Sequence, residues 1–148
     1  MKKISFVLAL MLIMASCTYN PTEIVEPYSF SREFTVYPTD WQRVETKEPE
    51  KSSMNTFFYY DLKVPELTSD ILNNGVMSAY LIYYDKNEKI FAPLPFDDFY
   101  KDKHDFMWIE QATCEFSFRS VRFIIKYSDF RIDILPEYEY TFMIKLLW

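Results

Sequence analysis

The sequence of 148 residues contains a single glycine, Gly75. Phosphate-binding loops depend on glycine, because only a residue without a side chain lets several backbone N–H groups approach the anion closely. The P-loop and the dinucleotide-binding fingerprint are therefore excluded. We expect no nucleotide ligand and no cofactor.

Cysteine and histidine are almost as scarce, with Cys17, Cys114 and His104 as the full complement. A Cys–His nucleophile would need Cys114 and His104 to meet across a hairpin. His104, however, lies in a charged run typical of a solvated loop, and a lone cysteine such as Cys114 is most often a small buried hydrophobe. Zinc would need further nitrogen or sulfur ligands, which are absent nearby. We therefore predict no metal site and no catalytic residue.

Positive charge is outnumbered, with 16 Lys and Arg against 22 Asp and Glu and a formal net charge of −6. An acidic surface repels phosphate backbones, so we expect no nucleic acid partner. A glycosidase would need two carboxylates that face each other, and calcium would need an oxygen-rich loop. The pattern instead indicates that Asp97, Asp98 and Asp102 belong to a solvated loop. Glu137 and Glu139 are expected at the exposed entry to a strand.

The N-terminus carries the most specific pattern. Lys2 and Lys3 precede an apolar run over residues 4–14, which is too short to span the ~30 Å core of a bilayer and so indicates a secretory signal. The segment Met14-Ala15-Ser16-Cys17 resembles a bacterial lipoprotein signal, with Met14 where leucine is usual. This resemblance implies cleavage before Cys17 and lipidation of Cys17. The alternative is an ordinary cleaved signal with an incidental cysteine.

The chain is thus expected to comprise a signal peptide at 1–16, a lipidated cysteine and flexible tether at 17–28, and one β domain at 29–148. Prolines and acids without periodicity indicate the tether. A lipid anchor places the protein on the cell outer membrane, and the sequence leaves open whether it faces the periplasm or the cell surface.

Aromatic residues are abundant, with 14 Phe, 12 Tyr and 3 Trp. They alternate with a period of two, which favours strands. The clearest strands are expected at 54–64, 76–84, 121–127 and 140–148, and shorter ones at 31–37, 89–94, 105–109 and 115–118. We expect the strand at 76–84 to be central and covered on both faces. Asn87 predicts a hairpin, while Thr68 and Gly75 predict a short helical turn between them.

This pattern predicts a mainly β fold, an antiparallel β-sandwich that is immunoglobulin-like or similar. A small closed β-barrel is the alternative. The chain also resembles small uncharacterised lipoproteins of Bacteroidetes as far as about residue 96. The positions that carry this resemblance are Pro65, Glu66, Leu67, Thr68, Ile71, Gly75, Val76, Tyr80, Leu94 and Pro95. It implies a β-rich domain and assigns no catalytic residue.

Three aromatic residues stand in polar or charged surroundings and are the candidates for ligand binding: Trp41, Tyr100 and Trp108. Exposed rings of this kind stack on sugars or anchor protein partners. We therefore expect a non-enzymatic, lipid-anchored envelope protein with a binding or structural role. A glycan-binding accessory lipoprotein is the first alternative, and an envelope hydrolase is the second.

Overall fold

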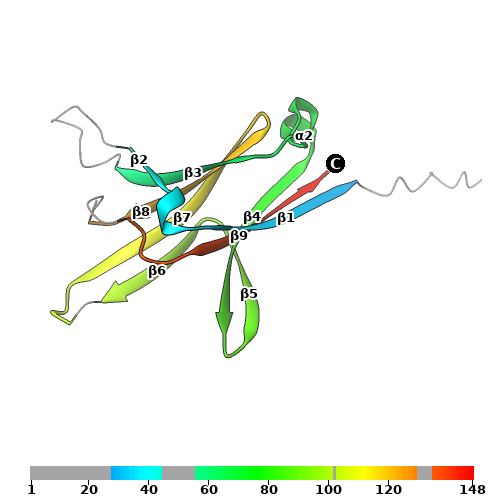
Figure 1. Ribbon diagram of the computed structural model, residues 1–148. Coiled ribbons are helices and arrows are strands. Elements are labelled where there is room, and N and C mark those ends of the chain that lie inside the picture. The colour runs from blue at the N-terminus through cyan, green and yellow to red at the C-terminus, as the bar shows by residue number, and fades with distance from the viewer. Residues whose placement is uncertain (1–27, 45–55, 102, 130–134) are drawn as a thin grey trace, which may run out of the picture.

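The computed structural model describes residues 28–44, 56–101, 103–129 and 135–148, which form two antiparallel sheets packed face to face (Figure 1). The four-stranded sheet has the order β1 (Ser29–Val36), β9 (Tyr140–Leu147), β4 (Val76–Asp85), β5 (Glu88–Pro93). The five-stranded sheet has the order β2 (Gln42–Val44), β3 (Phe57–Lys63), β8 (Ser120–Tyr127), β7 (Met107–Ser117), β6 (Phe96–Lys101). The expected sandwich is confirmed, and both sheets keep open edges.

The core lies between the sheets and combines aliphatic side chains with a central group of aromatic rings. Phe123 of β8 and Phe142 of β9 are fully buried, and their ring centroids are 4.6 Å apart across the sandwich. Phe34 of β1 packs edge-on against Phe123 at 5.1 Å. The two-residue alternation of β8 and β9 sends one apolar set inward from each strand, which explains why these two strands meet at the centre of the fold.

Two short helices interrupt the strands, η2 (Pro38–Asp40) and α2 (Ser69–Asn74). The Thr68 side chain caps α2 by accepting a hydrogen bond from the Ile71 N–H at 3.4 Å, as the sequence predicts. Gly75 follows the helix, but its φ of −86° is not left-handed. Glycine is needed there for space, because a Cβ would lie 2.8 Å from the Ile71 carbonyl oxygen and 2.9 Å from that of Leu147.

The β4–β5 hairpin turns at Lys86 and Asn87, whose φ angles of 47° and 71° are both left-handed. The expected hairpin is confirmed, and asparagine is among the residues that tolerate this conformation best. β4 lies inside its sheet, between β9 and β5. Its outer face is covered only in part, because Ile82 is buried while Tyr84 is exposed.

Three details differ from the sequence-based expectations. The strands expected at 105–109 and 115–118 are one strand, β7, and the segment expected as a loop around Asp97 and Asp98 is the edge strand β6. The alternation of the strand expected at 140–148 predicts that Trp148 points into the core, but Trp148 is 42% exposed and stacks on Tyr28 at the end of the sheet. In each case cross-strand pairing or position at an edge decides the outcome, and neither is visible in a local pattern.

The described chain begins and ends at the same end of the sandwich. The N–H groups of Tyr28 and Trp148 each donate to the carbonyl of the other, at 2.9 and 3.1 Å, beside α2 (Figure 1). The expected signal peptide, Cys17 and all of the tether before Tyr28 lie outside the described residues. Within the described ranges, no helix is long and apolar enough to cross a membrane.

Candidate functional site

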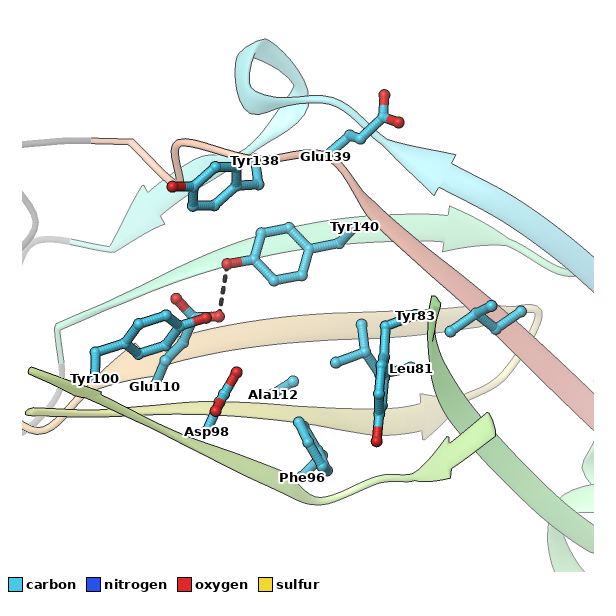
Figure 2. A pocket seen from close by; sticks show the side chains of 11 residues that line it. Leu81, Tyr83, Phe96, Asp98, Tyr100, Glu110, Ala112, Tyr138, Glu139 and Tyr140 are labelled. Carbon is cyan, nitrogen blue, oxygen red and sulfur yellow. Dashed lines mark hydrogen bonds between the residues drawn. The ribbon is translucent and has the colours of Figure 1, made fainter. Parts of the chain in front are cut away.

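A cleft of about 380 Å³ opens between the two sheets at the end of the sandwich remote from Tyr28. Its walls come from β4, β6, β7 and the segment that leads into β9 (Figure 2). A volume of this size lies in the usual range for small-molecule sites. The lining residues are Leu81, Ile82, Tyr83, Phe96, Asp98, Tyr100, Glu110, Ala112, Tyr138, Glu139 and Tyr140.

Strand register explains why two carboxylates share the floor of this cleft. Asp98 of β6 pairs directly with Glu110 of β7, and Glu110 pairs with Tyr127 of β8. Residues that pair directly across antiparallel strands lie on one face with Cβ atoms about 4.5–5.5 Å apart. The inner face of the five-stranded sheet is apolar at Ala112 and Ile125. At the cleft end of the same face, the side chains are carboxylates and a tyrosine hydroxyl.

Glu110 is the central group of this cluster. The Tyr140 hydroxyl donates to Glu110 Oε1 at 2.6 Å (Figure 2), and Tyr127 also hydrogen-bonds the carboxylate. Burial raises the pKa of Glu110, and Asp98 raises it further, although the two phenols act in the opposite direction. Burial and the negative charge of Glu110 in turn raise the pKa of Tyr140, Tyr127 and Tyr100, which therefore stay neutral hydrogen-bond donors.

Aromatic rings make up much of the remaining lining. Tyr100 and Trp108 stack with ring centroids 5.6 Å apart and an angle of 11°, and they border a second hollow of about 290 Å³ that shares Glu110, Tyr138 and Tyr140 with the cleft. Tyr83 and Phe96, 5.9 Å apart, close the opposite side. The cleft thus combines aromatic walls with a carboxylate floor.

Two of the three predicted ligand-binding residues come together here, and one does not. Tyr100 lines the cleft and Trp108 lines the adjoining hollow, as a stacked pair. Trp41 is only 5% exposed and packs edge-on against Tyr140 at 5.7 Å, so its expected exposure is wrong. η2 directs Trp41 inward, where its indole N–H has no hydrogen-bond partner among the described residues.

The weaker candidates do not assemble into a site. His104 lies in the turn before β7, whereas Cys114 lies seven residues into that strand, roughly 23 Å along it from Met107 at the strand rise of about 3.3 Å per residue. Burial raises the pKa of the Cys114 thiol to about 11, which opposes thiolate formation. Asp97 and Asp98 point to opposite faces of β6, and Asp102 lies outside the described residues. No cluster with three or more metal-ligating side chains occurs in the described ranges.

Sequence reasoning missed Glu110, Tyr138 and Tyr140 as site residues. A signal was present, because the face Trp108, Glu110, Ala112 places a carboxylate in an otherwise apolar alternation. A buried acid in such an alternation is a candidate functional group. Its partners Tyr138 and Tyr140 are far away in sequence, so only the fold brings them to it.

The raised pKa of Glu110 gives a testable pH dependence. The folded state favours the protonated acid, so wild-type stability falls as the pH rises from the ordinary value of 4.5 through the higher folded pKa. Glu110→Gln removes this titration, so the variant should gain stability relative to wild type between pH 4 and pH 8. Urea unfolding across this range measures the difference.

Glu115→Gln is the matched control for this measurement, because Glu115 is exposed on the opposite face of β7. It removes one carboxylate from the same strand without touching the cleft, and so shows how much of the change is specific to Glu110. A constant difference between wild type and Glu110→Gln across the range would contradict the raised pKa.

Comparison with known proteins adds no assignment, since no family model, no curated protein and no solved structure matches this chain. The resemblance to lipoproteins of Bacteroidetes therefore stays a prediction from the residues.

Proposed function

We propose that this protein is a non-enzymatic, lipid-anchored binding protein of the cell outer membrane, akin to the small lipoproteins of Bacteroidetes, and that its ligand binds in the cleft between β6, β7 and β9. The cleft itself is the observation that carries the proposal. It exposes polar groups where the rest of the interior is apolar, and such groups fix the orientation of bound ligands.

The position of the cleft supports this proposal. β1 begins at Ser29, directly after Tyr28, and its other end, Val36, pairs with Tyr140. Because Tyr140 lines the cleft, the cleft lies at the far end of the sandwich from the point where the described chain begins. A lipid on Cys17 would hold the domain by the Tyr28 end. The cleft would then face away from the membrane and remain open to ligands.

A glycan-binding accessory lipoprotein is the second candidate, because the stacked pair of Tyr100 and Trp108 beside two carboxylates is a lining that also suits sugars. An envelope hydrolase is the third, because Asp98 and Glu110 share one face as the acids of a glycosidase do. We rank the hydrolase last, since the hydroxyls of Tyr140 and Tyr127 already occupy the Glu110 carboxylate.

The three tryptophans provide a direct test of ligand binding. In the full-length protein labelled with 5-fluorotryptophan, Trp108 reports on the cleft, Trp41 on the core and Trp148 on the opposite end. A small-molecule fraction of cell-envelope extract should shift the fluorine resonance of Trp108 and leave that of Trp148 unchanged. Equal shifts of all three resonances, or no shift of Trp108, would contradict the proposal.

A further inference from the structure

We propose that the cleft takes a small organic cation, a molecule that carries a primary or quaternary ammonium group. This inference rests on the proposed function, because it names the class of ligand for the same cleft. It stands on three observations: the sign of the charges that line the cleft, the burial of one of them, and the rings that surround them.

Every charged side chain that lines the cleft and its adjoining hollow is a carboxylate. Asp98 and Glu110 lie on the floor, and Glu137 and Glu139 lie at the rim. No lysine or arginine of the described chain lines either hollow or forms an ion pair with Asp98 or Glu110. The chain as a whole carries a net charge of −6, so its overall field also attracts cations.

The Glu110 carboxylate is half-buried, and the groups that compensate its charge among the described residues are neutral hydroxyls, those of Tyr140 and Tyr127. A neutral ligand that displaced the remaining water would leave this charge still less compensated, which is unfavourable. An ammonium group at the same place supplies the missing counter-charge. Asp98 has acceptor capacity beyond the bonds it already makes, since a carboxylate offers about four lone-pair sites while its Oδ1 accepts from the Phe99 N–H at 2.8 Å and the Tyr100 hydroxyl also hydrogen-bonds it.

The rings complete the environment that ammonium groups prefer. Tyr138 and Tyr140 lie on the β9 side of the cavity, opposite Asp98 and Glu110 on β6 and β7 (Figure 2). Aromatic faces attract organic cations, and quaternary ammonium ligands are typically held in aromatic cages. Elsewhere this protein supplies such cations itself, because Arg122 lies 4.4 Å from the ring of Tyr59 and Lys145 lies 5.7 Å from that of Tyr80. In the cleft the rings and acids are present and the cation is not part of the lining.

The test titrates the full-length, fluorotryptophan-labelled protein in phosphatidylglycerol nanodiscs, whose lipid carries no ammonium group. The probes are choline, putrescine and 3,3-dimethyl-1-butanol, the last being the uncharged shape analogue of choline. Choline or putrescine should shift the Trp108 resonance with a Kd at least about tenfold lower than that of the alcohol. The choline shift should weaken in 0.5 M salt, because added ions screen the carboxylates.

Neighbouring acids on the same strands supply matched controls. Asp98→Asn and Glu110→Gln keep the shape of the side chain, remove its negative charge and retain one acceptor oxygen, and each should raise the Kd of choline by about three- to tenfold. Asp97→Asn and Glu115→Gln remove the same charge from the opposite faces of β6 and β7, so each should change the Kd by less than about twofold. All four variants should retain the wild-type circular dichroism spectrum.

Three outcomes overturn the organic-cation inference while the binding site stands. The first is equal binding of choline and its uncharged analogue, and the second is stronger binding of N-acetylglucosamine, which would favour the glycan alternative. The third is a shift of Trp108 by calcium chloride as large as that with choline, which would replace the organic cation with a plain ion. If no probe and no envelope extract moves the Trp108 resonance, the proposed function fails together with this inference.

Discussion

Replacing Phe142 with alanine should lower the free energy of unfolding by about 3–5 kcal/mol. Its ring is 0% exposed and lies 4.6 Å from Phe123, 5.9 Å from Phe34 and 6.1 Å from Tyr140, so the substitution leaves a cavity at the centre of the sandwich. Because small domains have a total stability of about 5–15 kcal/mol, this is a large share of it. Urea denaturation followed by circular dichroism measures the loss.

Phe99→Ala is the control, since Phe99 is 74% exposed on the edge strand β6. This substitution should lower the free energy of unfolding by less than about 1 kcal/mol. The Phe142 variant should also weaken ligand binding, because Tyr140 stacks on Phe142 and positions the hydroxyl that holds Glu110. A loss below about 1 kcal/mol for Phe142→Ala would show that the two sheets do not pack as described.

The long strands could be predicted from the sequence because their side chains alternate strongly. β4, β8 and β9 each place an apolar residue on the inner face at every second position, and that pattern is local. The hairpin at Asn87 and the cap at Thr68 were predictable for the same reason, since each depends on one residue and its nearest neighbours. The sandwich follows once several such strands lack helices between them.

The cleft could not be predicted in this way, because it depends on register. Asp98 was interpreted as part of a loop, and only its pairing with Glu110 places it inside the sandwich. Trp41 shows the opposite failure, since its polar neighbours suggested exposure while η2 directs the ring into the core. Local composition describes what surrounds a residue in the chain, whereas burial depends on which distant strand covers it.

The polar end of the sandwich has a cost in stability that its function would explain. An apolar side chain in place of Glu110 would pack against Ala112 and Tyr127 without a partly buried charge. Polar groups on an inner face that is otherwise apolar are expected at functional sites, where ligand binding offsets the loss of stability. The raised pKa of Glu110 is the measurable sign of this cost, and a bound cation should lower that pKa toward its ordinary value.

The largest expected effect on location comes from Cys17→Ala, which should release the protein from the membrane fraction into the soluble fraction. Each buried methylene of a lipid contributes about 0.8 kcal/mol, so one acyl chain gives weak and reversible binding while two or more give stable anchoring. Without Cys17 no lipid can be attached at the end of the expected signal. Fractionation followed by immunoblotting measures the release, and mass spectrometry of the N-terminal peptide shows the loss of the lipid.

Cys114→Ala is the matched control, because it removes the other cysteine, a free thiol half-buried on β7, and should leave the protein in the membrane fraction.

Protease treatment of intact cells then separates the two orientations that the sequence leaves open. Digestion of wild type in intact cells indicates the cell surface, where the cleft meets extracellular ligands. Protection until the outer membrane is permeabilised indicates the periplasm, and ligands of the envelope interior become the ones to test. Retention of Cys17→Ala in the membrane would contradict the lipid anchor, and with it the argument that the cleft faces away from the membrane.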